Sequence, residues 1–221
     1  MAAQLDGPRL EPRGGAAKRL VVFLHGYGAD GNDLIEIGRA WQPLLPDTAF
    51  VSPNAPERCV GAPTGRQWFA LTFRDPDERW RGVNAAAPIL NAFLDAELER
   101  RKLPPSALAL VGFSQGTMMA LHVGLRRPTP PAGIVGYSGL FVLPNNAAPD
   151  VVVGEIASRP PVLLIHGDQD ELIPVQALFH ATQTLAALEV PTEWHISPGI
   201  GHGIDQEGLR HGGEFLARRR F

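Results

Sequence analysis

Cysteine is almost absent from this 221-residue sequence, which contains only Cys59. No disulfide can form within the chain, so the small disulfide-rich domains of secreted proteins are excluded, and the composition is compatible with a reducing compartment. The sequence also lacks an apolar stretch long enough to cross a bilayer, and its first residues lack the apolar segment of a secretory signal. These absences predict a cytoplasmic protein with no membrane span.

A surplus of charge of either sign is missing as well. The 20 Lys and Arg residues are scattered and are offset by 23 Asp and Glu residues, which leaves a net charge of -3. Proteins that bind nucleic acid usually carry a concentrated basic surface, so no nucleic-acid partner is expected. Hydrophobic residues make up 44% of the chain and charged residues 19%, the balance of a folded globular protein. We therefore expect one domain over residues 1–221, and the sequence specifies no oligomeric state.

Short apolar runs alternate with amphipathic stretches along the chain. The run at 20–25 is almost entirely apolar and is followed by a glycine, which is typical of a strand buried on both faces. Strict alternation of strands and helices predicts an α/β fold with a mostly parallel central sheet and helices on both faces. Residues 4–11 are predicted as an antiparallel edge strand. The remaining predicted strands are 49–52, 108–112, 133–137, 162–166 and 193–196, and the predicted helices are 32–41, 83–102, 115–126, 175–188 and 205–219.

Two longer segments, 57–80 and 139–153, interrupt this alternation. Loops of that length in a compact domain are usually functional or disordered. The first is rich in aromatic residues, and the second in Pro, Asn and Val. We predict that at least one of the two segments lines a substrate site with apolar side chains, although packing in the core would explain any one of these side chains equally well. The predicted wall residues are Trp68, Phe69, Leu71 and Phe141.

The run Gly112-Phe113-Ser114-Gln115-Gly116 lies between a predicted strand and a predicted helix. A nucleophilic serine in this position sits on a sharp, strained turn, and glycines two residues before and after it leave room for that turn. The turn exposes the serine Oγ above the carboxyl ends of the strands. A plain tight turn with Ser114 as a helix cap is the alternative, but the strand-turn-helix context favours a catalytic nucleophile.

A serine hydroxyl needs a base, and the sequence offers seven histidines. When the nucleophile lies on such a turn, the chain order is serine, acid, histidine. His202 lies in a glycine-containing loop directly after the last predicted strand, from which an imidazole can reach across the sheet to Ser114. His211 is the alternative to His202, but its place in a predicted helix is typical of a residue that simply faces solvent. We therefore predict His202 as the general base.

The acid that orients this histidine is predicted in the run His166-Gly167-Asp168-Gln169-Asp170, which follows a strand directly. Asp168 directly follows Gly167, and its side chain can be engaged in local hydrogen bonds that stabilise the turn at this glycine. Asp170 lies further along the loop, where it can reach the next loop. Asp170 is therefore the first candidate and Asp168 the second.

An oxyanion hole needs a second backbone donor besides the Gln115 N–H at the start of the helix. The glycine-containing run that begins at His25-Gly26-Tyr27-Gly28 follows the first predicted parallel strand, and the Tyr27 N–H is the expected partner. The glycine spacing does not fit a dinucleotide site or a P-loop. For His25 we favour a structural hydrogen bond over a catalytic role. No cofactor and no metal are expected.

Taken together, these motifs resemble the phospholipase/carboxylesterase family of α/β-hydrolases, which includes bacterial carboxylesterases and acyl-protein thioesterases. The resemblance covers the chain from about residue 20 onward. It implies Ser114, Asp170 and His202 as triad, Tyr27 and Gln115 as oxyanion donors, and thus selects Asp170 over Asp168. The markers are Leu24-His25-Gly26-Tyr27-Gly28-Ala29-Asp30, Ser52-Pro53-Asn54-Ala55-Pro56, Gln67-Trp68-Phe69, Gly112-Phe113-Ser114-Gln115-Gly116, the 166–174 run and Gly201-His202.

One position departs from the family pattern. Better-known members carry an aspartate after the Trp-Phe pair, whereas this chain has Ala70, so the substrate preference of another member does not transfer. The 139–149 segment is too short for a large helical cap, which implies an open site for small or extended esters. The predicted function is therefore a serine carboxylic ester hydrolase acting through an acyl-enzyme. The alternatives are an acyl-protein thioesterase or lysophospholipase-like enzyme and, from another class, a non-catalytic binding module on a hydrolase scaffold.

Overall fold

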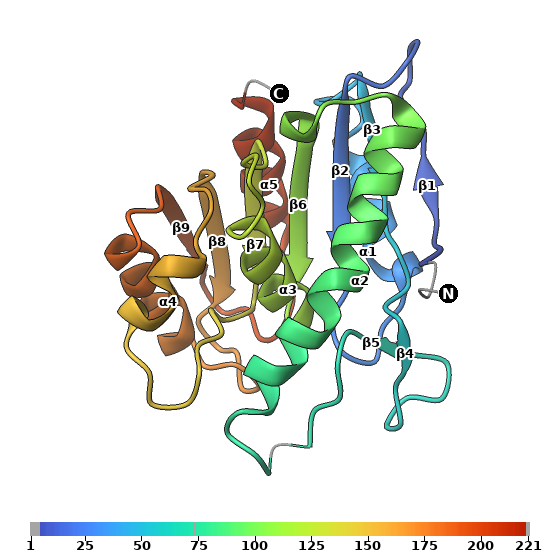
Figure 1. Cartoon of the computed structure of the whole chain (residues 1–221). Coiled ribbons are helices and arrows are strands. Elements are labelled where there is room, and N and C mark those ends of the chain that lie inside the picture. Colours follow the sequence, from blue (N-terminus) through green and yellow to red (C-terminus); the bar gives the residue numbers. More distant parts are fainter. Residues whose placement is uncertain (1–4, 73, 220–221) are drawn as a thin grey trace.

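The computed structural model describes residues 5–72 and 74–219. In this part of the chain, seven strands form one sheet in the order β1-β3-β2-β6-β7-β8-β9 (Figure 1). All neighbouring strands are parallel except β1, which runs antiparallel to β3 at the edge. The predicted α/β class is therefore confirmed. The strands are β1 (Arg9–Leu10), β2 (Arg19–Leu24), β3 (Thr48–Val51), β6 (Leu108–Phe113), β7 (Gly133–Tyr137), β8 (Val162–Gly167) and β9 (Thr192–Ser197).

Helices cover both faces of the sheet, as Figure 1 shows. One apolar cluster joins the sheet to α2, α3 and α4, and a second cluster joins the opposite face to α1 and α5. Because the central strands contribute to both clusters, their side chains are apolar on both faces, which explains the unbroken apolar runs of the sequence. The helices are α1 (Gly31–Trp41), α2 (Glu78–Arg101), α3 (Gln115–Gly124), α4 (Gln176–Ala187) and α5 (Gln206–Ala217).

The edge strand and α2 differ in extent from the prediction. The antiparallel pairing involves only Arg9 and Leu10, and Gln4, the first residue of the predicted edge strand, lies outside the described residues. Helix α2 begins at Glu78 rather than at residue 83. Its first turn contains three charged residues and a single apolar one, Trp80, and all four are exposed or half-buried, so it carries no apolar periodicity from which the start could be predicted.

The 57–80 segment is tied to the sheet rather than extended into solvent. It contains a small antiparallel hairpin of β4 (Glu57–Arg58) and β5 (Arg66–Gln67). Arg66 exchanges backbone hydrogen bonds with the loop after β2: the Gly28 N–H donates to its carbonyl, 2.9 Å, and its own N–H donates to Ala29, 2.7 Å. This pairing brings the hairpin to the carboxyl ends of the strands, at the lower edge of the sheet in Figure 1.

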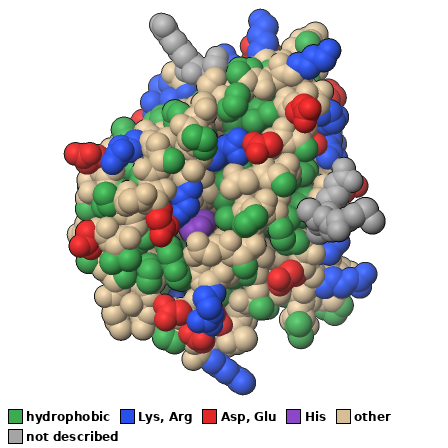
Figure 2. Space-filling view, viewed as in Figure 1, with side chains coloured by type: hydrophobic (Ala, Val, Ile, Leu, Met, Phe, Trp, Pro, Cys, Tyr) green, Lys and Arg blue, Asp and Glu red, His purple; other side chains and the backbone are tan. Residues whose placement is uncertain are grey.

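The 139–153 segment stays close to the sheet. It ends in a short 3-10 helix, Pro149–Glu155, and no cap domain is built from it or from any other described segment. Figure 2 shows charged side chains of both signs spread over the visible face. None of the helices in the described ranges has the length and apolar character needed to cross a membrane.

Candidate active site

Ser114 lies between the end of β6 and the start of α3, in a strained backbone conformation with φ 54° and ψ -115°. A non-glycine residue in this region costs about 1–3 kcal/mol and persists only where its surroundings enforce it. The backbone hydrogen bond from the Ser114 N–H to the Tyr137 carbonyl, 2.9 Å, anchors the turn to the neighbouring strand. Gly112 and Gly116 make the turn possible, because a Cβ on the first would meet the Gly116 carbonyl and a Cβ on the second the Leu24 carbonyl.

His202 and Asp170 come together from two loops that follow β9 and β8. The Nδ1 of His202 lies 2.7 Å from Oδ2 of Asp170. The other carboxylate oxygen accepts hydrogen bonds from the backbone N–H groups of Leu172 and Ile173, both at 2.9 Å. The Asp170 side chain is fully buried, whereas the imidazole of His202 is 16% exposed. A buried carboxylate held in this way keeps an imidazole in one tautomer and leaves its Nε2 free to accept a proton.

A second imidazole, which the sequence analysis left without a role, lies against the same carboxylate. The Nε2 of His166 is 3.3 Å from Oδ2 of Asp170 and 2.7 Å from the carbonyl oxygen of Ile173. Since that carbonyl can only accept, the Nε2 of His166 carries a proton. His166 therefore ties the end of β8 to the turn that holds Asp170. Its position two residues before Asp168 gave no signal of this contact, which depends on how the turn folds back.

Asp168, the second candidate for the acid, is engaged elsewhere. Its Oδ1 accepts a hydrogen bond from the Gly199 N–H, 2.7 Å. Gly199 belongs to the loop that carries His202, so Asp168 braces that loop. The far end of the loop is fixed by Asp205, which accepts from the Ser197 hydroxyl at 2.7 Å and from the Gly208 N–H at 2.9 Å. Burial alone would raise the pKa of Asp205, but these hydrogen bonds hold it below its usual value.

The two predicted oxyanion donors lie at one pocket. Tyr27 and Gln115 both line the cavity that contains Ser114. Within residues 5–72 and 74–219, neither of their backbone N–H groups donates to another protein group. Two free donors beside a serine are what a developing oxyanion requires. The side chain of Tyr27 is partly exposed, and its hydrogen bond with Cys59 raises the pKa of the phenol.

The Gln115 side chain has a role that the sequence did not indicate. It is 1% exposed, its Oε1 accepts from the Trp68 N–H at 2.9 Å, and its Nε2 donates to the Phe69 carbonyl at 2.8 Å. The Trp68 indole in turn donates to the His25 carbonyl, 3.0 Å. These contacts fasten the 66–71 segment to the start of α3 and to the loop after β2, which are the two sources of the oxyanion donors.

His25 braces the loop after β2. Its Nδ1 donates to the Gly26 carbonyl, 2.8 Å, and its Nε2 accepts from the Ala55 N–H, 3.0 Å. Burial lowers the pKa of His25, which keeps the imidazole neutral and suited to both hydrogen bonds. This is the structural role that we favoured for it from the sequence.

A cavity of about 380 Å³ surrounds Ser114. Leu71 is the one of the four predicted wall residues that lines it, together with side chains that were not predicted. Trp68 and Phe69 are buried, 1% and 4% exposed, and pack in the core, and Phe141 packs against the same core. The lining residues are Gly26, Tyr27, Ala29, Leu71, Arg79, Phe113, Ser114, Gln115, Met118, Leu172, Ile173 and His202.

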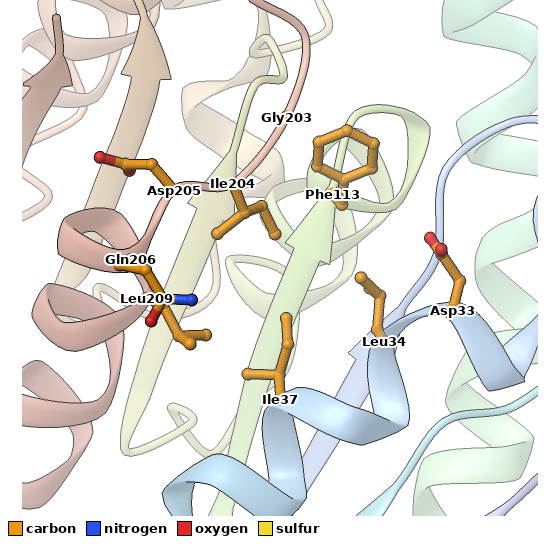
Figure 3. A pocket seen from close by; sticks show the side chains of 9 residues that line it. All are labelled: Asp33, Leu34, Ile37, Phe113, Gly203, Ile204, Asp205, Gln206 and Leu209. Carbon is orange, nitrogen blue, oxygen red and sulfur yellow. The ribbon is translucent and has the colours of Figure 1, made fainter. Parts of the chain in front are cut away.

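Phe113 borders two cavities. Its ring centroid lies 5.0 Å from that of His202, and it also lines a second hollow of about 330 Å³ between α1 and α5. Figure 3 shows the Phe113 ring at one end of this hollow, with Leu34 and Ile37 of α1 facing Ile204 and Leu209 across it. Phe113 thus supports the histidine loop as well as the site around Ser114.

Comparison with known proteins identifies the family. Residues 5–219 match the sequence profile of the Phospholipase/Carboxylesterase family. The chain belongs to this family. The structure of esterase PE8 has a TM-score of 0.92 and 47% identity, covering 98% of this chain and all of that one (100%).

Two curated proteins are also similar to the chain. Esterase YpfH of Escherichia coli K12 is 28% identical over 88% of this chain and 80% of its own length. Acyl-protein thioesterase 1 of Gibberella zeae is 25% identical over 99% of this chain and 98% of its own length. The family and the esterase neighbour confirm the predicted α/β-hydrolase fold.

Proposed function

We propose that this ester hydrolase of the phospholipase/carboxylesterase family is a serine carboxylesterase that uses Ser114, His202 and Asp170. The observation that carries the proposal is the 2.7 Å contact between His202 Nδ1 and the buried Asp170 carboxylate, with the same imidazole and Ser114 lining one cavity. A non-catalytic binding module would need neither a fixed imidazole tautomer nor free backbone donors, so this geometry supports an enzyme.

In the proposed acylation half-reaction, Ser114 Oγ attacks the ester carbonyl carbon while His202 Nε2 takes the hydroxyl proton. The carbonyl oxygen becomes an oxyanion that accepts from the Tyr27 and Gln115 N–H groups. Asp170 stabilises the imidazolium through Nδ1. The carbon–oxygen bond to the alcohol then breaks, and the leaving oxygen receives the proton from His202. Each oxyanion donor of this kind contributes about a hundredfold to a thousandfold in rate.

In the proposed deacylation, a water molecule replaces the alcohol. His202 Nε2 accepts one water proton as the oxygen attacks the acyl carbon, and the same amides bind the second oxyanion. When the tetrahedral intermediate collapses, Ser114 Oγ leaves and recovers the proton from His202. The products are a carboxylic acid and the free enzyme, so these residues complete the cycle with water as the only co-reactant.

The cavity supports esters with an apolar acyl or alcohol group. Leu71, Phe113, Met118, Leu172 and Ile173 supply apolar surface, and the absence of a cap domain in the described segments leaves room for an extended substrate. The volume of about 380 Å³ falls within the range of small-molecule sites. We therefore expect hydrolysis of small to medium acyl esters.

The decisive experiment is Ser114→Ala with Ser106→Ala as the matched control, because Ser106 is exposed in the 3-10 helix at the opposite end of β6. We expect Ser114→Ala to lose at least about a thousandfold in kcat on p-nitrophenyl esters. It should also lose labelling by a fluorophosphonate while unfolding at the same temperature as the parent. Full activity in Ser114→Ala would overturn the proposed nucleophile.

Substrate class is tested with matched pairs. An oxygen ester and a thioester with the same acyl chain, together with a lysophospholipid, separate a carboxylesterase from the thioesterase and lysophospholipase alternatives. The carboxylesterase proposal expects the largest kcat/KM on the oxygen ester. A larger value on the thioester or the lysophospholipid would move the protein to that alternative and leave the proposed Ser114 chemistry unchanged.

A further inference from the structure

A cluster of metal-ligating side chains lies away from the proposed active site, between strand β9 and helix α5. It consists of His195 on β9 and of Glu207 and His211 on α5. Each residue offers one ligand atom, and these atoms all lie within 4.8 Å of one another. None of the three residues lines the cavity around Ser114. Ester hydrolysis therefore gives no reason for their convergence.

The local structure explains how the three side chains meet. Glu207 and His211 are four residues apart on α5, so they lie on one face of the helix, with Glu207 Oε1 3.6 Å from His211 Nε2. Helix α5 packs alongside β9, and the ring centroids of His195 and His211 are 4.3 Å apart. The two imidazoles therefore lie against each other, and imidazole nitrogen is the commonest protein ligand of metal ions.

Each ring has a nitrogen that is available to a metal ion. The Nε2 of His195 is buried and, among the described residues, has no hydrogen-bond partner. A buried nitrogen without a partner is costly unless something else occupies it. The Nε2 of His211 lies 3.4 Å from Nη2 of Arg210. Because a guanidinium can only donate, this nitrogen must present its lone pair.

Arg210 carries a positive charge that has to move away from Glu207 and His211 when an ion binds. Its Nη2 is 3.4 Å from Glu207 Oε1, but its Nη1 makes two shorter bonds of 2.9 Å to the Glu214 carboxylate. The guanidinium can therefore leave Glu207 and His211 while keeping Glu214 as its partner.

From these contacts we infer that His195, Glu207 and His211 bind a zinc-type divalent transition metal ion. Two imidazoles and one carboxylate are a known zinc donor set, with ligand distances of about 2.0–2.2 Å and a fourth position left for water. Tetrahedral geometry then separates ligand atoms by about 3.3–3.6 Å, which the three side chains reach by small rotations. The side chains of Glu207 and His211 are 54% and 32% exposed, so the ion can enter from solvent.

The position of the site gives the ion a structural role. His195 lies before, and Glu207 and His211 lie after, the 198–205 loop that carries His202. An ion bound to all three would link the two ends of that loop, in parallel with the Ser197–Asp205 hydrogen bond. Metal binding should therefore stabilise the folded state through mass action.

The test measures Zn²⁺ binding to the full-length protein by isothermal titration calorimetry and by thermal unfolding in a buffer that does not chelate metals. We expect one saturable site with a micromolar or lower Kd. We also expect a rise in Tm of at least about 3 °C at saturating Zn²⁺, reversed by EDTA. Glu207→Gln changes an exposed helical position and His211→Asn a half-buried one with a smaller polar side chain, so both variants should fold and bind Zn²⁺ at least about tenfold more weakly.

His180→Asn is the matched control, because His180 is exposed on α4 and lies outside the cluster. It should bind Zn²⁺ as the parent does. If His211→Asn and Glu207→Gln retain the parent affinity, the ion binds elsewhere, for example at His202, and the inference is wrong. The same holds if the parent shows no saturable binding. Neither readout depends on ester hydrolysis, so the result is independent of the proposed activity.

Discussion

His166 lies against Asp170, with its Nε2 3.3 Å from the carboxylate Oδ2 that also faces His202. The same nitrogen donates to the Ile173 carbonyl, while the Leu172 and Ile173 N–H groups bind the other carboxylate oxygen. The proposed acid is thus enclosed by donors on both oxygens. Small displacements of catalytic groups can cost a hundredfold in rate, so His166 should act as a positioning residue.

The first prediction is a double-mutant cycle on His166 and Asp170. Asp170→Asn should lower kcat by about a thousandfold to ten-thousandfold, because the imidazole loses its tautomer and its counter-charge. His166→Ala should lower kcat by about tenfold to a hundredfold, with KM little changed. In the Asp170→Asn background, His166→Ala should add little, since it acts through the missing carboxylate. Steady-state kinetics on a p-nitrophenyl ester measure all four proteins, and fully additive losses would contradict the positioning role.

The second prediction concerns the side chain of Gln115. Gln115→Ala keeps the backbone N–H of the oxyanion hole but leaves the buried Trp68 N–H and Phe69 carbonyl without partners. Each such group costs about 1–3 kcal/mol, so the free energy of unfolding should fall by several kcal/mol at most. The kcat should fall as well, because the 66–71 segment supports the oxyanion loop. Urea unfolding and kcat on one ester measure both effects.

A comparison with Gln115→Glu separates the two hydrogen bonds of that side chain. Glu can still accept from the Trp68 N–H, but its second oxygen faces the Phe69 carbonyl and repels it. Gln115→Glu should therefore also lose stability, and more so at neutral than at acidic pH, where the carboxyl group can donate. A parent-like stability of both variants would show that the bridge does not hold the segment.

The sequence was sufficient for the features that depend on local pattern. The unbroken apolar runs predicted the parallel strands because both faces of the sheet are covered, and the glycines around Ser114 predicted the strained turn. It was not sufficient for contacts that arise when distant loops meet. The partners of His166 and of the Gln115 side chain depend on the paths of the 166–174 and 66–71 segments, which no periodicity encodes.

The wall of the cavity illustrates the same limit for Trp68 and Phe69. An aromatic pair in a long loop is equally compatible with a pocket surface and with a buried anchor. Here the Arg66 pairing and the Gln115 side chain draw the pair inward, so within residues 66–71 it is Leu71 that lines the cavity. The chemical identity of a residue does not distinguish these outcomes, whereas the backbone contacts of its neighbours do.

The third prediction tests the wall directly with Leu71→Ala against Phe141→Ala. Leu71 lines the cavity. Truncation of Leu71 should enlarge the cavity and move the optimum of kcat/KM toward longer acyl chains. The ratio of kcat/KM between neighbouring chain lengths should change by up to about tenfold to two-hundredfold. Phe141 packs against the core, so its truncation should lower stability and leave the chain-length profile unchanged. A graded series of p-nitrophenyl esters gives both profiles. Equal shifts in both variants would mean that the profile responds to general loosening of the fold.

The fourth prediction concerns His122, a histidine of α3 whose side chain packs edge-on against the Trp80 ring. Burial, assisted by the charge of Arg126, lowers the pKa of His122 from its ordinary value of 6.5 to about 3. The unfolded chain therefore binds a proton between pH 6.5 and pH 3 that the folded protein does not. Folded stability is fully present above pH 6.5 and falls as the pH drops toward 3. Between pH 7 and pH 5 the loss should be about 2 kcal/mol.

Urea unfolding at pH 7 and pH 5 measures this loss, and His122→Gln provides the comparison because glutamine does not titrate. The Gln variant should start less stable at pH 7, where it replaces a well-packed neutral ring, but its stability should fall by about 2 kcal/mol less on acidification. His180→Gln is the control, since that side chain is exposed on α4 and should leave the pH dependence as in the parent. Other buried groups, including His25 with its lowered pKa, add to the acid sensitivity of every protein in the set. Only the difference between the parent and His122→Gln isolates the contribution of His122. If the free energy of unfolding fell equally in these two proteins between pH 7 and pH 5, the His122 ring would be protonated at pH 5 in the folded state as well, and the prediction would be wrong.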